Sequence, residues 1–261
     1  MKSWRLAWTL AEISDSSNIA KHRRALRSPW KFWAALFLKF VPFVWPFPIQ
    51  LRLRRGGVVT VREFMTLFIY KEIFVDGCYD LPLPTAPSVI VDIGANTGLF
   101  MIRMKQLYPN AGIRGYEPLP SNYAQLRQNL ELSALDKVET CMQGVGGTTR
   151  KEKLYVHPSN IGGHSIHRSL AGGGRHIEID LVGLRELLDS LDGQRCDVLK
   201  LDCEGAELEI IKSIDEEMAK RIDNVVFEPT PSLYDVTQLV EHLKSIGYRV
   251  GDYKGLCWAR R

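Results

Sequence analysis

Residues 89–100, VIVDIGANTGLF, decide the fold of this chain. Val89, Ile90 and Val91 predict a short buried strand, which ends in the carboxylate of Asp92. The next residues, GANTG at 94–98, carry little side-chain bulk and predict a tight turn, and a helical pattern begins at Leu99. A buried strand, a glycine-rich turn and a helix N-terminus together form the nucleotide-binding corner of an α/β sheet.

Strand and helix patterns alternate downstream of this corner. Strands are predicted over residues 112–116, 137–142, 198–201 and 225–227, and two more over 248–250 and 256–259. Helices are predicted over residues 99–106, 122–132, 184–191, 207–214 and 239–246. The alternation predicts an α/β fold, a doubly wound, mostly parallel, seven-stranded sheet.

Residues 154–156 and 177–179 predict an inserted pair of strands. The loop between them, residues 159–174, contains five glycines and four histidines lie in or beside it. We expect this loop to be a lid or an acceptor platform, and a plain flexible surface loop is the alternative.

Length and composition suit one α/β domain with an appendage, since 45% of the 261 residues are hydrophobic and 25% are charged. We divide the chain into a basic, aromatic segment (1–49), a hairpin, helix and linker (50–87), and the main domain (88–261). Five scattered cysteines without a CxxC motif favour free thiols in a reducing compartment, so we expect a cytoplasmic protein.

The basic residues gather at the N-terminus. Residues 1–60 carry eleven Lys and Arg against two acidic residues, a net charge of +9, which leaves −5 for the rest of a chain whose net charge is +4. Residues 30–49 are strongly apolar, but Lys39 and three prolines interrupt them, so a membrane-spanning helix is not expected. A signal peptide also fits poorly, because the apolar run starts late and no small-residue cleavage site follows it.

Two interpretations of the N-terminal segment stay open. Residues 30–49 either pack their aromatic side on the main domain or anchor the protein at a membrane surface. In the second case residues 30–55 would contact lipid, with Trp and Phe at the acyl boundary and Lys and Arg at anionic head groups, and the protein would be peripheral on the inner membrane face.

Four acidic residues end successive predicted strands: Asp92, Glu117, Asp202 and Glu228. Ligands of such sheets bind outside the carboxyl ends of the strands, so the four should share one rim. The turn lacks both the GxGxxG fingerprint of dinucleotide sites and the GK[ST] of a P-loop. A carboxylate at its start would repel phosphate and suits a cation, which favours S-adenosylmethionine, with Glu117 accepting hydrogen bonds from its ribose hydroxyls.

Three segments carry a family resemblance: DIGANTG at 92–98, YEP at 116–118 and LKLDCEGAE at 199–207. They resemble the motifs of class I S-adenosylmethionine-dependent methyltransferases of the FkbM family, over residues 72–250, with Cys203 where the family usually has valine. The resemblance implies a Rossmann-like methyltransferase fold and O-methylation of sugars and other natural-product hydroxyls. The cofactor contacts that it implies are Asp92, Gly94, Ala95, Asn96, Gly98, Glu117, Pro118 and Asn122, with Gln143, Gly144 and Val145 beside the adenine and Asp202 near the amino group or the transferred methyl.

A hydroxyl acceptor must lose its proton, so a catalytic acid–base group is expected on the rim. The candidates are Asp202, Glu204, Glu228 and His164. Each of the last three has a structural alternative: Glu204 as a helix cap, Glu228 as the partner of an arginine, and His164 as a solvated loop residue. A metal site built from the loop histidines has no suitable carboxylate or cysteine between them, so no metal is expected.

Three functions compete at this stage. The leading one is an S-adenosylmethionine-dependent O-methyltransferase acting on a glycan, a lipid-linked sugar or a secondary metabolite. A nucleic-acid or other N-methyltransferase is second, but the acidic main domain and the absence of an NPPY-like segment disfavour it. A non-catalytic, membrane-associated protein that binds the cofactor is third. The acceptor and the oligomeric state do not follow from the sequence.

Overall fold

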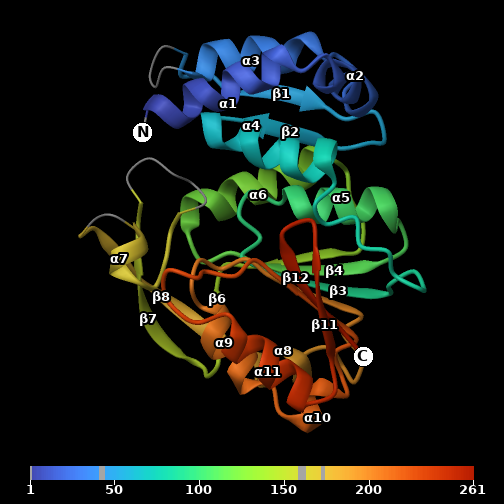
Figure 1. Cartoon of the computed structure of the whole chain (residues 1–261), viewed down its shortest axis with the longest axis vertical. Helices are drawn as coiled ribbons and strands as arrows, with labels where there is room; N and C mark the ends of the chain where they lie inside the picture. The colour runs from blue at the N-terminus through green and yellow to red at the C-terminus, as the bar shows by residue number, and fades with distance from the viewer. Residues whose placement is uncertain (1, 41–44, 158–162, 172–173) are drawn as a thin grey trace.

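A seven-stranded sheet forms the centre of the molecule (Figure 1). The computed structural model describes residues 2–40, 45–157, 163–171 and 174–261. The strand order is β11-β12-β10-β9-β3-β4-β5. The strands are β3 (Val89–Ile93), β4 (Gly112–Tyr116), β5 (Val138–Cys141), β9 (Val198–Leu201), β10 (Asn224–Phe227), β11 (Arg249–Tyr253) and β12 (Leu256–Arg260). All neighbours pair in parallel except β12, which is antiparallel to both β10 and β11. The predicted sheet is confirmed.

The strand order reverses at β3. The chain runs from β3 to β4 and β5 in one direction and then returns to place β9 on the other side of β3. In the register of these strands, Asp92 lies between Gly115 of β4 and Lys200 of β9. Ligands of doubly wound sheets bind at such a reversal, beyond the carboxyl ends of the strands.

Two apolar clusters cover the two faces of the sheet. Alternate residues of β3 belong to different clusters, Ile90 to one and Val91 to the other, so apolar residues of this strand are buried on both faces of the sheet. On one face pack α5 (Leu99–Leu107) and α6 (Pro120–Leu132). On the other pack α8 (Leu184–Asp189), α9 (Glu207–Ser213), α10 (Glu216–Ala219) and α11 (Thr237–Ser245).

The predicted strand pair is confirmed as β7 (Arg150–Tyr155) and β8 (His176–Gly183), but a third strand joins it. β6 (Gly144–Gly146) pairs in parallel with β8. No strand was predicted here, because three residues with two glycines show no alternation. A short helix, α7 (Arg168–Ala171), lies in the predicted lid, whose residues 159–162 and 172–173 fall outside the described ranges.

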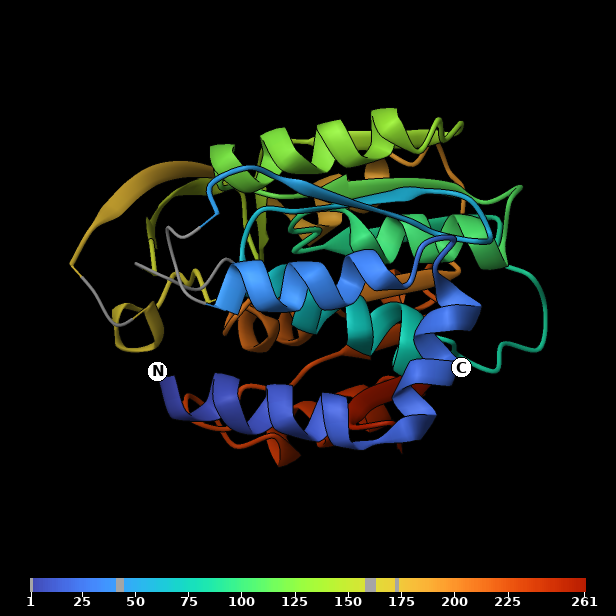
Figure 2. The same cartoon turned by 90° about the horizontal axis from the view of Figure 1, so that it is seen from above.

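The N-terminal quarter of the chain lies over α5 and α6 (Figures 1 and 2). It comprises α1 (Lys2–Ser14), α2 (Ser16–Ala25), α3 (Trp30–Phe40), the antiparallel hairpin β1 (Ile49–Arg52) and β2 (Val58–Val61), α4 (Phe64–Tyr70) and the π-helical turn η1 (Lys71–Asp76). The predicted hairpin is confirmed.

The same segment shares its apolar cluster with the main domain. Phe32, Ala35 and Leu36 of α3 are buried in a cluster that also holds residues of α4, α5 and β3. The inner side of α3 therefore packs on the main domain, as the first of the two interpretations of residues 30–49 predicts. Among the described residues, none of the helices has the length and apolar character needed to cross a bilayer. The domain boundary near residue 88 stays a prediction.

Candidate functional site

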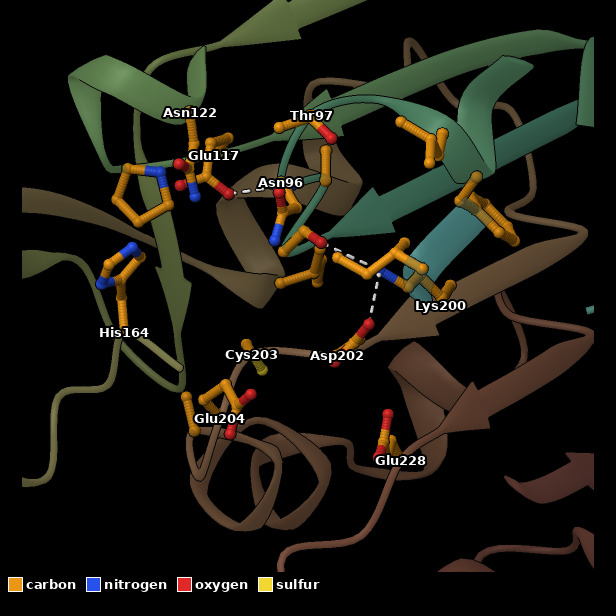
Figure 3. A pocket seen from close by; sticks show the side chains of 18 of the residues that line it. Asn96, Thr97, Glu117, Asn122, His164, Lys200, Asp202, Cys203, Glu204 and Glu228 are labelled. Carbon is orange, nitrogen blue, oxygen red and sulfur yellow. Dashed lines mark hydrogen bonds and ion pairs between the residues drawn. The ribbon is translucent and has the colours of Figure 1, made fainter. Parts of the chain in front are cut away.

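A cavity of about 440 Å³ lies at the carboxyl ends of β3, β4 and β9 (Figure 3). All four catalytic candidates line it: His164, Asp202, Glu204 and Glu228. The predicted cofactor contacts that line it are Gly94, Ala95, Asn96, Glu117, Pro118, Asn122, Gly144, Val145 and Asp202. Three predicted contacts, Asp92, Gly98 and Gln143, are absent from its lining. Segments distant in sequence therefore converge on one site.

The glycine turn owes its shape to two close approaches. A Cβ atom at Gly94, whose φ is +77°, would lie 1.9 Å from the backbone oxygen of Asp202, so only glycine lets the turn rest against the end of β9. Gly98, with φ +82°, precedes α5, and a Cβ atom there would lie 3.3 Å from Leu126 of α6. Gly98 thus serves helix packing, which explains its absence from the cavity.

Glu117 is held rigidly at the end of β4. Its side chain accepts hydrogen bonds from the backbone N–H of Asn96 (2.9 Å) and of Leu119 (3.0 Å). Burial raises the pKa of Glu117 to about 7 although these hydrogen bonds oppose the shift. Beside it, the buried hydroxyl oxygen of Thr97 has no hydrogen-bond partner among the described residues. The corner therefore offers polar oxygen atoms to a hydroxyl-bearing ligand.

Asp92 reaches the cavity only through a lysine. Its carboxylate is fully buried, and its Oδ1 lies 2.9 Å from Nζ of Lys200. The same ammonium group donates to the backbone oxygen of Gly94 (2.9 Å) and lies 3.4 Å from Oδ2 of Asp202. Although burial opposes it, these two carboxylates raise the pKa of Lys200. The cation that Asp92 attracts is thus one of the chain's own side chains.

Asp202 stands between Lys200 and the open cavity. Its Oδ2 also accepts a hydrogen bond from the hydroxyl of Tyr79 at 3.3 Å. The Lys200 ammonium lies 5.8 Å from the Tyr79 ring centre and 5.6 Å from that of Phe100, both distances typical of cation–π contact. Asp202 is about one-third exposed, so one carboxylate with a fixed orientation faces the ligand space.

Further carboxyl groups surround Asp202. Burial, followed by the negative charge of neighbouring carboxylates, raises the pKa of Glu72 to about 7 and that of Glu204 to about 8. Partial burial and Asp202 likewise raise the pKa of Glu228 to about 7 at the solvent-exposed rim. Figure 3 shows Glu204 and Glu228 on the side of the cavity opposite Glu117 and Asn122. Such mutual repulsion favours a cationic ligand, because a cation would stabilise the ionised forms.

The helix-cap alternative for Glu204 is wrong, because α9 begins at Glu207 with Ala206 as its N-cap and has no side-chain cap hydrogen bond. The Glu207 carboxylate accepts hydrogen bonds from the backbone N–H of Cys203 (2.9 Å) and Gly205 (2.8 Å). Glu204 itself has the uncommon φ of +52°, and its carboxyl group forms no hydrogen bond or ion pair with the described residues. Its backbone oxygen accepts a hydrogen bond from the hydroxyl of Ser165. Glu204 is therefore held by its backbone with its acid group free in the cavity.

The structure also clarifies the other two candidates. Nδ1 of His164 accepts a hydrogen bond from the backbone N–H of His157 at 3.0 Å, and burial lowers the pKa of His164 to about 4. A neutral imidazole that accepts at Nδ1 carries its proton on Nε2, so it can donate a hydrogen bond but is a poor proton acceptor. No arginine forms an ion pair with Glu228 in the described ranges.

The described residues contain no cluster of side chains that could bind a metal ion. No group of three or more His, Cys, Asp and Glu side chains in these ranges is placed to hold a metal ion.

The sequence analysis assigned no role to three cavity residues: Glu72, Tyr79 and Lys200. Lys200 had a recognisable signal, because a lysine within an apolar central strand must find a partner once it is buried. Glu72 and Tyr79 lie before β3, in segments whose route over the rim depends on the tertiary fold.

Comparison with known proteins adds a family. A family model described as "Methyltransferase FkbM domain" matches residues 92–250. "Methyltransferase sdnD" of Sordaria araneosa is 39% identical over 204 residues, which cover 67% of this chain and 78% of that protein. "Methyltransferase 1" of Beauveria bassiana is 31% identical over 202 residues, covering 70% and 81%.

More distant relatives carry more specific names. "31-O-demethyl-FK506 methyltransferase FkbM" of Streptomyces tacrolimicus is 26% identical over 230 residues, covering 77% of this chain and 88% of that protein. Among solved structures, a methyltransferase FkbM from Methylobacillus flagellatus aligns with a TM-score of 0.48 at 16% identity, covering 76% of this chain and 54% of that one.

Proposed function

The chain belongs to the FkbM methyltransferase family, and from this premise we propose that it transfers a methyl group from S-adenosylmethionine to a hydroxyl oxygen of a small molecule. The observation that carries the proposal is the cavity itself. It joins a rigid carboxylate on β4, a glycine turn and an unpartnered acid group on the opposite wall. The names of two relatives refer to methyl transfer at an oxygen atom. They are "31-O-demethyl-FK506 methyltransferase FkbM" and "2-O-methyltransferase NoeI".

The polar groups of the cavity fit S-adenosylmethionine better than a phosphate-bearing cofactor. Glu117 and Thr97 would hold the ribose hydroxyls, and Gly144 and Val145 of β6 would border the adenine. Asp202 would face the positive charges of the methionine part, with Lys200 fixing its orientation. When bound, this cofactor supplies a methyl group activated by a sulfonium. The surplus of carboxyl groups around Asp202 disfavours a polyphosphate, which would be repelled.

Glu204 is the residue that we propose as proton acceptor. A group with a pKa near the working pH takes a proton most effectively, and burial together with Asp202 raises that of Glu204 to about 8. Because its carboxyl group has no hydrogen-bond or ion-pair partner among the described residues, it can bind the acceptor hydroxyl without breaking another interaction. Glu72 and Glu228 would bind further acceptor hydroxyls, and Nε2 of His164 would donate to an acceptor oxygen.

The acceptor side of the cavity is partly apolar. Met65, Phe68 and Ile69 of α4 and Ile73 of η1 line it, and these residues lie upstream of the matched family domain. We therefore propose an acceptor that combines an apolar skeleton with hydroxyl groups, as in a secondary metabolite or a lipid-linked sugar. A free polysaccharide chain fits these apolar side chains less well.

Incubation with S-adenosylmethionine labelled on its methyl group tests the proposal. We expect label in ether linkage on hydroxyl-bearing compounds from a panel of metabolite and glycan extracts, and we expect it to be lost in Glu204→Gln. Label on nitrogen or on nucleic acid would contradict the proposal. Cofactor binding without any transfer across the panel would favour the non-catalytic alternative.

A further inference from the structure

Exposed apolar side chains concentrate in the N-terminal segment. Ten large hydrophobic residues are exposed in the described parts of the chain, and eight of them lie between residues 6 and 47. They are Leu6, Leu10, Ile13, Ile19, Trp30, Phe37, Trp45 and Phe47. Scattered single residues of this kind need no explanation, but a concentration in one segment indicates an interaction surface.

The outward sides of α1 and α3 are both apolar. Leu6, Leu10 and Ile13, each at least half exposed, recur at helical spacing on α1, opposite the buried Glu12. On α3, Trp30 (65% exposed) and Phe37 (82% exposed) are two turns apart. Both helices lie in the outermost layer at one end of the molecule, at the top of Figure 1. The description of residues 1–49 as basic and aromatic missed the apolar side of α1.

A buried lysine fixes two more aromatic residues beyond the end of α3. Nζ of Lys39 donates to the backbone oxygens of Trp45 (2.7 Å) and Phe47 (2.9 Å). Their rings lie 5.5 Å apart in an edge-to-face contact, and both are exposed. We call the surface formed by the outward sides of α1 and α3 and by residues 45–47 the apolar cap.

Basic residues far outnumber exposed acidic ones in residues 1–60, the segment that carries the apolar cap. Of the two acidic residues among positions 1–60, Glu12 is buried against His22 at 2.7 Å, so only Asp15 is exposed. A second cavity of about 230 Å³, between α2 and η1, is lined by Lys21, Arg24, Arg55 and Arg103. Within the described ranges the first three of these cations form no ion pair.

We propose that the apolar cap docks on an anionic phospholipid surface, with its aromatic and aliphatic side chains at the acyl boundary and the surrounding cations at lipid phosphates. This combination of an apolar helix side and flanking Lys and Arg is what interfacial binding requires. Docking of two copies through the same cap would bring two segments of +9 together, and that repulsion disfavours self-association. The proposal goes beyond the methyl transfer and does not depend on it.

The apolar cap also lies close to the catalytic cavity. The ring of Trp8 on α1 contacts Phe64 (5.5 Å) and Phe68 (5.7 Å) of α4, and Phe68 also lines the cavity. A residue of α1 therefore contacts a side chain that belongs to the acceptor wall of the cavity. An acceptor held in the membrane would meet the enzyme at this end of the molecule.

Co-sedimentation of the full-length protein with vesicles tests the docking directly. One set of vesicles is phosphatidylcholine alone, and the other contains a minority of phosphatidylserine. We expect sedimentation with the anionic vesicles at low salt, little with the neutral ones, and release by high salt. The double variant Trp30→Ser/Phe37→Ser should lose affinity by about tenfold or more, because it removes two membrane-facing aromatic rings.

Matched controls separate docking from general stickiness. Leu132→Ser and Met142→Ser alter the two exposed apolar residues outside the segment, which are 42% and 52% exposed, and should sediment like the wild type. Urea unfolding of each variant confirms that it is folded. Equal sedimentation of the double variant and the wild type would overturn the proposal, as would no sedimentation at all. A wild-type dimer that the double variant dissociates would overturn it in favour of a second copy as the occupant.

Discussion

Replacing Lys200 by methionine removes the cation that lies between Asp92 and Asp202. At an effective dielectric constant of about 20, opposite charges 2.9 Å apart, as in the Lys200–Asp92 pair, attract each other by roughly 6 kcal/mol. Desolvation offsets part of this attraction in the wild type, but Lys200→Met leaves Asp92 fully buried and unpaired. Breaking a buried pair in this way typically costs about 3–5 kcal/mol. We expect the free energy of unfolding to fall by that amount, and Tm by roughly 6–20 °C.

Urea unfolding followed by circular dichroism at neutral pH measures the loss. The double variant Asp92→Asn/Lys200→Met removes both charges and should recover most of the stability, since an uncharged pair has no charge to desolvate. Lys151→Met is the matched control, because Lys151 pairs with Glu178 at 3.0 Å with both side chains about 70% exposed, and it should lose less than about 1 kcal/mol. A loss below about 1 kcal/mol in Lys200→Met, or no recovery in the double variant, would refute the pairing.

Four further predictions concern the cavity wall and the turn before α9. Glu204→Gln should lower kcat by about 10²-fold or more in the methyl-transfer assay, whereas an unchanged kcat would remove Glu204 from the mechanism. The pKa values of three carboxyl groups are raised in the folded state, to about 7 for Glu72, about 8 for Glu204 and about 7 for Glu228. The folded state therefore holds these protons more tightly than the unfolded chain does. The free energy of unfolding should consequently fall as pH rises from about 5 to 8. S-adenosylmethionine is a cation, so its affinity should increase as pH rises over the same range. Calorimetry that shows weaker binding at higher pH would contradict the proposal that the carboxylate cluster binds it. Glu207→Ala should cost about 1–3 kcal/mol in urea unfolding, because it leaves the buried backbone N–H of Gly205 and the hydroxyl of Tyr234 without their acceptor.

The sheet and the location of the site could be predicted from the sequence because each rests on local patterns. Short, largely apolar segments identify β3, β9 and β10, and the acidic residues at the ends of these parallel strands are carried to the same rim. Glycine spacing at 94–98 identifies the turn, since the backbone conformation there requires glycine. Most of the correctly predicted cavity residues therefore lie at the ends of strands or in the turns that follow them.

The electrostatic partners within the site could not be predicted, because they depend on the register of neighbouring strands. Asp92 pairs with Lys200 only because β3 and β9 place them opposite each other. The same holds for the turn before α9, where the Glu207 carboxylate accepts from the backbone N–H of Cys203 and Gly205 while the carboxyl group of Glu204 points into the cavity. The outward side of α1 was missed because its three apolar residues are diluted by polar neighbours, and only the fold shows which side is exposed.

Calorimetric titration of the purified protein with S-adenosylmethionine tests the central claim most directly. We expect saturable binding to the wild type, a loss of at least about tenfold in affinity for Glu117→Ala, and no change for Glu139→Ala, which alters a 68% exposed carboxylate on the adjacent strand β5. Absence of binding to the wild type, or equal affinity for the wild type and Glu117→Ala, would contradict the assignment of this cavity to the cofactor.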